Sequence, residues 1–183
     1  MDIKKRVIHI FGASGSGTST LGRAVAARTG FRCMDTDDYY WLPAEPMYTL
    51  KRPIPERLAL MERDLDGCDG AVLSGSLAGW GDPLIPRFTL AVRLVTPTPV
   101  RMERLRQREL VRYGARVLPG GDMHEQSQAF LDWAAQYDDG VPPIRSRALH
   151  DLWQRQLTCP LLTLDGTLPV EELTEIVVGA MIR

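Results

Sequence analysis

A glycine-rich stretch that could bind phosphate, GASGSGTST, occupies residues 12–20. Its spacing fits the pattern G-x-x-x-x-G-K-[ST], except that Thr18 stands where the pattern has lysine. Glycines let successive main-chain N–H groups point at one anion, and a following helix adds its positive N-terminal end. Ser19 holds the hydroxyl position that ligates Mg²⁺ in such loops. The stretch predicts a phosphate-binding loop, the alternative being a Gly/Ser turn without a ligand.

An acidic cluster follows the second apolar run of the chain. Asp35, Asp37 and Asp38 lie within the segment DTDD. One interpretation is a solvated turn that caps a helix, because aspartate is a good N-cap residue. The other gives Asp35 to a metal ion and Asp37 to an acceptor hydroxyl, as a base or an orienting group. Its position just past a predicted strand, beside the glycine loop, favours the second interpretation.

The segment SGSLAGWGD, residues 74–82, departs from the usual arrangement of phosphate-loop proteins. An acidic residue usually ends this strand and helps to hold the metal, whereas this chain has Ser74. Asp82 is the nearest following acid. It is either a substitute for the missing carboxylate or a loop cap, and both interpretations stay open.

A long charged helix is expected over residues 98–114. Spacings of three and four residues place four of its arginines on one face: Arg101, Arg104, Arg108 and Arg112. The face could simply be solvated and balanced by Glu103 and Glu109. Like charges at this spacing repel each other, however, and bound phosphates would explain their coexistence. Arg145 and Arg147 are candidates to extend the cluster.

The elements that must position these residues alternate between strand and helix patterns. We expect strands over residues 6–11, 31–35, 70–76, 88–97 and 159–166 and helices over 19–30, 55–67, 98–114, about 124–140, 144–157 and 169–182. Residues 36–55 are expected to form a loop or a short helical excursion. The alternation predicts an α/β fold with a parallel sheet covered on both faces. Ligands of such sheets bind at the carboxyl ends of the strands.

The composition bounds the classes of function. The 183 residues suit one domain, and the formal net charge of −1 disfavours a polyanion binder. The three cysteines lack CxxC spacing, so we expect reduced, mostly buried thiols and a cytoplasmic protein. No stretch approaches the roughly 20 apolar residues that a membrane span needs. His9, His124 and His150 show no metal-ligand spacing and are expected to be structural or surface residues.

The whole chain resembles the small P-loop kinases, the adenylate kinase and shikimate kinase-like group. The resemblance rests on FGASGSGTSTLGRAVA, FRCMDTDDYYW, LVTPTPVRMERLRQRE and LLTLDG. The segment RLRQRE resembles the start of the arginine-bearing lid of these enzymes, and LDGT resembles the loop that borders their adenine. The GGG loop and the acceptor arginines of shikimate kinases are not evident, and the DGFPR segment of adenylate kinases is absent. The acceptor therefore stays open.

The resemblance implies a single three-layer P-loop NTPase domain over residues 1–183. It implies a five-stranded parallel sheet in the order 2-3-1-4-5 with helices on both faces. An acceptor-binding excursion would span about 36–68 and a helical lid about 112–140. ATP and Mg²⁺ are the implied cofactors, and a small-molecule acceptor is the implied partner.

The resemblance also implies roles for individual residues. The nucleotide phosphates would contact Gly12, Ser14, Gly15, Ser16, Gly17, Thr18, Ser19 and Thr20. Ser19 and Asp35 would bind the metal. Asp37, Arg104 and Arg108 would serve catalysis. Without a lysine at position 18, Arg104, Arg108, Arg112 or Lys51 would have to bring a cation to the phosphates.

Three functional hypotheses follow from these observations. The first is an ATP-dependent phosphotransferase for a small metabolite or nucleotide. The second is an ATP-binding sensor or regulatory protein, motivated by the loss of both the lysine and the third-strand acid. The third, a nucleic-acid-related P-loop protein, is disfavoured by the near-neutral net charge. The first is preferred because a sensor would leave the acidic pair and the lid without a use.

Overall fold

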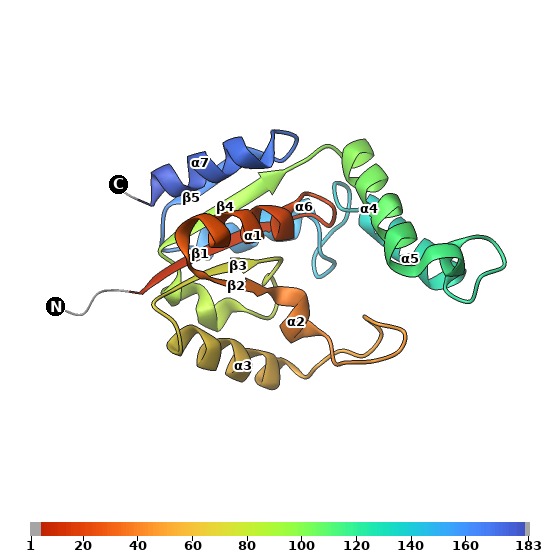
Figure 1. Cartoon of the computed structure of the whole chain (residues 1–183), viewed down its shortest axis with the longest axis horizontal. Coiled ribbons are helices and arrows are strands. Elements are labelled where there is room, and N and C mark those ends of the chain that lie inside the picture. Colours follow the sequence, from red (N-terminus) through yellow and green to blue (C-terminus); the bar gives the residue numbers. More distant parts are fainter. Residues whose placement is uncertain (1–4, 182–183) are drawn as a thin grey trace.

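Five short strands form one parallel sheet in the order β2-β3-β1-β4-β5 (Figure 1). The computed structural model describes residues 5–181. The strands are β1 (Arg6–Gly12), β2 (Arg32–Asp35), β3 (Gly70–Ser74), β4 (Leu90–Val95) and β5 (Leu161–Asp165). The α/β fold class, the parallel pairing and the strand order predicted above are confirmed.

Seven α-helices are present in the part of the chain that the structure describes. They are α1 (Thr18–Thr29), α2 (Thr36–Tyr40), α3 (Ile54–Asp66), α4 (Thr98–Tyr113), α5 (His124–Ala135), α6 (Arg147–Trp153) and α7 (Val170–Ala180). Three short 3₁₀ helices, Asp82–Arg87, Gly114–Val117 and Gln154–Gln156, lie between them. In Figure 1, α4 and α5 form an arm that extends away from the sheet.

The helix expected over residues 144–157 is shorter than predicted. It begins at Arg147 because the Ser146 side chain caps it, accepting a hydrogen bond from the Leu149 amide. The helix expected to reach residue 140 ends at Ala135. Residue 182, the last of the predicted C-terminal helix, lies outside the described residues.

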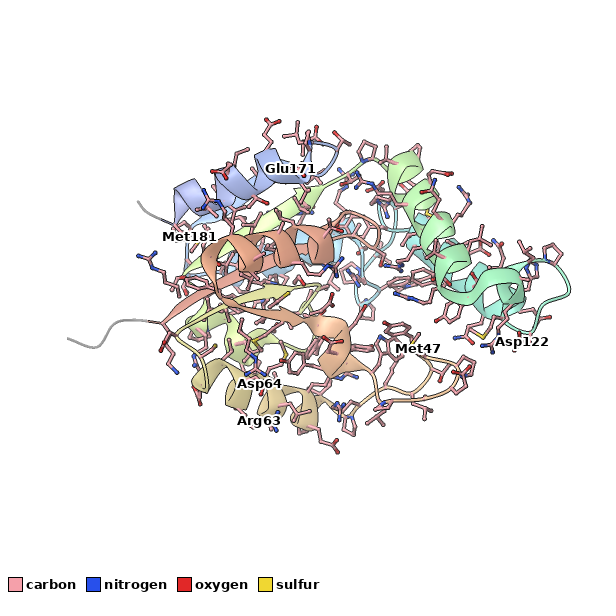
Figure 2. All side chains as sticks on the ribbon, in the orientation of Figure 1. Met47, Arg63, Asp64, Asp122, Glu171 and Met181 are labelled. Carbon is pink, nitrogen blue, oxygen red and sulfur yellow. The ribbon has the colours of Figure 1, made fainter. Side chains whose placement is uncertain are left out.

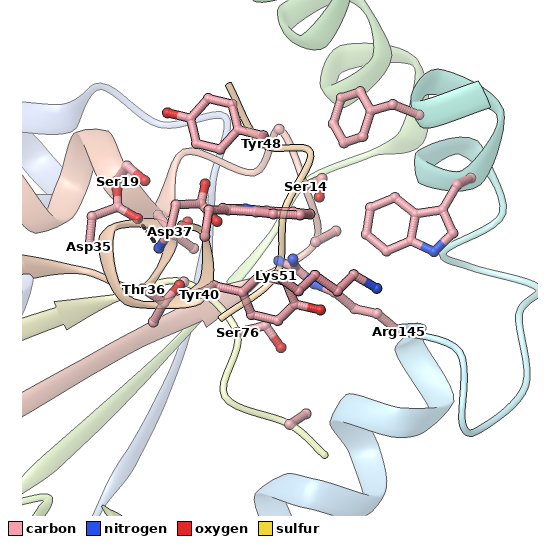
Figure 3. A pocket seen from close by; sticks show the side chains of 18 of the residues that line it. Ser14, Ser19, Asp35, Thr36, Asp37, Tyr40, Tyr48, Lys51, Ser76 and Arg145 are labelled. Atoms are coloured by element: carbon pink, nitrogen blue, oxygen red, sulfur yellow. Dashed lines mark hydrogen bonds between the residues drawn. The ribbon is translucent and has the colours of Figure 1, made fainter. Parts of the chain in front are cut away.

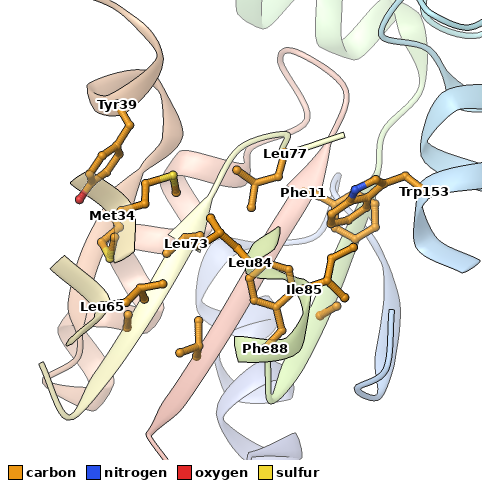
Figure 4. Close-up of a cluster of buried hydrophobic side chains, with 14 residues drawn as sticks. Phe11, Met34, Tyr39, Leu65, Leu73, Leu77, Leu84, Ile85, Phe88 and Trp153 are labelled. Carbon is orange, nitrogen blue, oxygen red and sulfur yellow. The ribbon is translucent and has the colours of Figure 1, made fainter. Parts of the chain in front are cut away.

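The sheet buries both of its faces, as the continuous apolar runs predict. On one face Phe11 and Leu73 pack with Met61 of α3 and Trp153 of α6 (Figure 4). On the other face Ile8, Ile10 and Val72 pack against α1 and α7. Packing in these two cores fixes the position of the strands and therefore the position of their carboxyl ends.

Two of the three histidines are structural. The His9 ring is fully buried between the rings of Phe11 and Phe88, and burial lowers the pKa of His9 to about 3. His150 is also buried and its pKa falls to about 2, first through desolvation. Both are therefore neutral at physiological pH.

The prediction of mostly buried cysteines is wrong. Cys33 is exposed, and Cys68 and Cys159 are only partly buried, although all three are free thiols. Cys33 lies on β2, an edge strand that has a neighbouring strand, β3, on one side only, and this leaves more of its side chain uncovered. Within residues 5–181 no helix combines the length and the apolar character that a membrane crossing requires.

Candidate active site

A cleft of about 840 Å³ opens at the carboxyl ends of β1, β2 and β3 (Figure 3). The loop after β1 forms one wall, and the start of α2 and the segment after β3 form the next. Arginines and aromatic side chains of α4 and α5 face them from across the cleft. The position agrees with the general placement of ligands in parallel α/β sheets.

The glycine loop presents free main-chain donors beside this cleft. Gly15 and Gly17 adopt positive φ angles of 81° and 101°, which glycine tolerates without strain. Within residues 5–181 the N–H groups of Ser14, Gly15 and Gly17 have no protein acceptor, whereas Ser16 N donates to Ala13 O at 3.1 Å. The first amides of α1 are unpaired by the geometry of a helix start. This arrangement suits an anion.

The eight residues predicted to contact phosphates are divided by the fold. Ser14, Gly15, Thr18 and Ser19 line the cleft, whereas Gly12, Ser16, Gly17 and Thr20 are not among its lining residues. Gly12 is needed behind the loop, since a Cβ there would lie 2.6 Å from Leu94 O.

The arginine face predicted for α4 does not act as one unit. Arg101 is fully buried, and its guanidinium donates to three main-chain carbonyls, those of Ser14, Thr96 and Ala134. The expectation that Arg101 faces phosphate is therefore wrong. The residue lies behind the loop and braces it against α4.

The other arginines of α4 divide between two places. Arg108 and Arg112 line the cleft. Arg104 is not part of its lining; its Nη1 donates to Gly166 O at 3.0 Å and to Ser16 O at 3.4 Å. Arg104 thus joins the glycine loop to the loop after β5.

The two acids of the DTDD segment that were predicted to act both line the cleft. Asp35 caps α2, because its Oδ1 accepts a hydrogen bond from the Asp37 amide at 3.1 Å. The Asp37 side chain is open to the cleft, but the walls displace most of the surrounding water, and this desolvation raises the pKa of Asp37. The charge of Asp35 raises it further, against the opposing effect of Arg145, Arg108 and Arg112.

Ser74 and Asp82, whose roles the sequence left open, both have structural roles away from the cleft. Ser74 is fully buried, and a Cβ on Gly22 of α1 would lie 2.7 Å from its Cβ, so a larger acid has no room there. Asp82 accepts a hydrogen bond from Trp153 Nε1 at 2.8 Å and is not among the residues that line the cleft. Arg147 lies outside the cleft and pairs with Asp138 at 2.7 Å.

Comparison with known proteins places the chain in a family. No family model matches the sequence. The chain is 49% identical over 168 residues to the "Uncharacterized protein YqaC" of Bacillus subtilis (strain 168), a match that covers 92% of this chain and 93% of that protein. The chain belongs to the YqaC family.

Solved structures share the fold of this YqaC-family chain at low sequence identity. A gluconokinase from Sinorhizobium meliloti 1021 superimposes with a TM-score of 0.53 at 17% identity, over 100% of this chain and 94% of that one. A shikimate kinase from Acinetobacter baumannii in complex with shikimate gives 0.53 at 16% identity, over 97% and 93%. The YqaC-family chain therefore has the fold of the small P-loop kinases.

Two cleft residues of this YqaC-family chain were not predicted as site residues in their own right. Arg57 was not predicted at all, and Arg145 was predicted only as an extension of the arginine cluster. Arg57 lies on the buried stripe of α3 with Met61 and Leu65, and its guanidinium stands 3.7 Å from the centre of the Tyr40 ring. The available sequence signal for Arg57 was its place, as a charged residue, on the apolar face of a predicted helix. Arg145 reaches the cleft from the segment before α6, and no spacing pattern connected it to the glycine loop.

The segment after α2 meets the C-terminal end of α4 and the turn that follows it. Tyr113 Oη donates to Met47 O at 3.3 Å, and Arg116 pairs with Glu45 at 2.9 Å. The Arg112 guanidinium lies 4.4 Å from the centre of the Tyr48 ring. Figure 2 shows Met47 beside the arm formed by α4 and α5.

Proposed function

We propose that this YqaC-family protein is an ATP-dependent phosphotransferase acting on a hydroxyl of a small metabolite or nucleotide. The observation that carries the proposal is that unpaired loop amides and the carboxylate of Asp37 border the same cleft. Phosphoryl transfer needs mainly positioning and electrostatic stabilisation of the phosphate oxygens. In this proposal the loop amides would bind the phosphates and Asp37 would act as the base.

Each element of the site would have one task. The amides of the glycine loop and the start of α1 hold the triphosphate. The acceptor oxygen bonds to the γ-phosphorus as the bond to the bridging oxygen of ADP breaks, and Asp37 takes the hydroxyl proton. Arg108 stabilises the charge that develops on the transferred group. Arg104, held beside Gly166, contributes to nucleotide binding next to the loop after β5.

The residues proposed for magnesium fit that ion. The Ser19 hydroxyl and the Asp35 carboxylate both line the cleft and supply the hard oxygen ligands that Mg²⁺ prefers. The Asp37 amide occupies Oδ1 of Asp35, and no hydrogen bond occupies Oδ2 among the described residues. Magnesium bound there would neutralise negative charge on the phosphates.

We also assign separate roles to two segments of the chain. Residues 36–68 would bind the acceptor, and residues 112–140 would act as a lid over a single P-loop domain. Their contacts across the mouth of the cleft support this division, because closing the cleft excludes water from the transfer. ATP and the acceptor would be the partners, in the cytoplasm.

A second candidate function is an ATP-binding sensor without transfer. Thr18 and Ser74 favour it, since neither the loop lysine nor the third-strand acid is present. A sensor would bind ATP and undergo a change of shape without acceptor-dependent turnover.

A coupled assay of ADP release distinguishes the two functions. We expect ADP release with Mg-ATP to rise at least tenfold above background for one member of a panel of sugar acids, hydroxylated ring acids and nucleoside monophosphates. Mass spectrometry of the product should show one added phosphoryl group. ATP binding without turnover on every panel member would favour the sensor.

A further inference from the structure

We propose that Arg145 supplies, from outside the glycine loop, the positive charge that a lysine at position 18 supplies in the usual pattern. This inference rests on the proposed ATP-dependent function. It assigns to Arg145 a direct contact with the β- and γ-phosphates of the nucleotide.

The position of the Arg145 guanidinium is the first argument. Its Nη2 donates to Gly12 O at 2.9 Å, and Gly12 is the first residue of the glycine loop. Arg145 and Thr18 both line the cleft. In Figure 3 the Arg145 side chain enters the pocket from the α6 side and extends toward Ser14 and Asp37. A cation is thus fixed to the loop although the loop sequence has none.

The hydrogen-bonding state of the guanidinium is the second argument. Its Nε is buried and has no partner among the described residues. The hydrogen bond of Nη2 to Gly12 is the one that the guanidinium makes within residues 5–181, so most of its five N–H donors are free. Burial lowers the pKa of Arg145 from its ordinary value, yet a guanidinium stays charged at neutral pH. A phosphate group would satisfy these donors.

The charges around Arg145 are the third argument. The proposed base, Asp37, lines the same cleft, and the Arg145 side chain extends toward it (Figure 3). A cation at the γ-phosphate must stand between the loop and the acceptor base. Arg145 meets this requirement, because it is hydrogen-bonded to Gly12 of the loop and lines the same cleft as Asp37.

The other cations in or near the cleft meet this requirement less well. Arg104 is held by the carbonyls of Ser16 and Gly166, away from the cleft lining. Arg108 and Arg112 lie near the rings of Phe130 and Tyr48. Lys51 is exposed on the segment after α2. Among the cations that line the cleft, Arg145 is the one with a hydrogen bond to the glycine loop in the described part of the chain.

The anchoring of Arg145 favours a fixed role over a lid-dependent one. The next residue, Ser146, is fully buried and caps α6. The Arg145 backbone is therefore held by the helix start, whereas Arg108 and Arg112 belong to the arm of α4 and α5. A charge that replaces a loop lysine should be in place before the lid acts.

Calorimetry with Mg-ATP and Mg-ADP in the absence of acceptor tests the proposal. Arg145→Ala should weaken ATP binding by about 10–100-fold, the range expected for charge-assisted hydrogen bonds, and ADP binding less. Arg145→Gln, which keeps a donor without the charge, should lose nearly as much. Arg147→Ala is the matched control: it removes an arginine two residues away, outside the cleft, and should leave both affinities within twofold.

A double variant that moves the positive charge from position 145 to position 18 provides the decisive test. Thr18→Lys added to Arg145→Ala should restore at least tenfold of the lost ATP affinity, because the lysine returns the charge from the loop side. Circular dichroism and the melting temperature verify that each variant is folded. Unchanged ATP affinity in Arg145→Gln would overturn the proposal and leave Arg145 as a candidate for acceptor binding. No restoration by Thr18→Lys would also overturn it, because the charge of Arg145 would then not be the one that a loop lysine supplies. Wild-type protein that binds no ATP would instead remove the proposed function itself.

Discussion

Asp37→Asn should lower acceptor-dependent turnover by about 10²–10⁴-fold, the usual contribution of a general base. The amide keeps the size of the side chain but cannot accept the hydroxyl proton. Affinity for Mg-ATP measured without acceptor should change little, because in the proposed site the loop amides, and not Asp37, would hold the phosphates. Single-turnover kinetics with the acceptor found in the panel assay measure the effect.

The pH dependence of this variant adds a second readout. Desolvation and the charge of Asp35 raise the pKa of Asp37 above the ordinary aspartate value of 3.8. The protonated form is inactive as a base, so wild-type turnover should fall as the pH drops through that raised pKa. The acidic limb of the wild-type profile should therefore lie at a higher pH than an ordinary aspartate would give, and it should be absent from Asp37→Asn.

Asp38→Asn is the control for Asp37→Asn. Asp38 is the neighbouring exposed acid and is not among the residues that line the cleft. Turnover of this variant should stay within about threefold of wild type. A loss in Asp38→Asn equal to that in Asp37→Asn would mean that general charge, and not a base at position 37, supports the reaction.

Arg101→Met should destabilise the protein by about 3–5 kcal/mol, the loss typical when one partner of a buried polar network is removed. The fully buried guanidinium serves the carbonyls of Ser14, Thr96 and Ala134 and the hydroxyl of Thr98. Methionine fills part of the volume but leaves those acceptors without donors. Urea unfolding followed by fluorescence gives the free energy of unfolding.

The same substitution should also weaken nucleotide binding. Arg101 braces the glycine loop through Ser14 O, and a Cβ on Gly15 would lie 2.7 Å from Arg101 O, so loop and helix fit closely. Arg106→Met, on the exposed face of α4, should change the free energy of unfolding by less than about 0.5 kcal/mol. A loss below 1 kcal/mol in Arg101→Met would show that the network is dispensable.

The sheet and the glycine loop could be predicted because their signals are local. Apolar runs such as VIHIF are buried on both faces of a parallel sheet, and the glycine spacing reports a backbone geometry. Asp35 and Asp37 could be found because they lie at the carboxyl end of a strand, the first as its last residue and the second just beyond it. Strand order came from the resemblance, since pairing between distant strands is not encoded in a local pattern.

The remaining features depend on tertiary packing. The spacing places four arginines of α4 on one helical face: Arg101, Arg104, Arg108 and Arg112. Tertiary packing buries Arg101 and leaves Arg108 and Arg112 lining the cleft. Arg145 lies 133 residues from the carbonyl that it binds, so no local pattern connects the two. The exposure of Cys33 follows from its place on an edge strand, which composition cannot give.

Titration calorimetry of the wild-type protein with ATP, with magnesium present and acceptor absent, tests the central claim most directly. The free amides of the glycine loop and the start of α1 should bind one ATP per chain, with an affinity that survives the absence of a lysine at position 18. Removing magnesium should weaken that binding. Failure of both ATP and GTP to bind would contradict the account of the cleft as a nucleotide site.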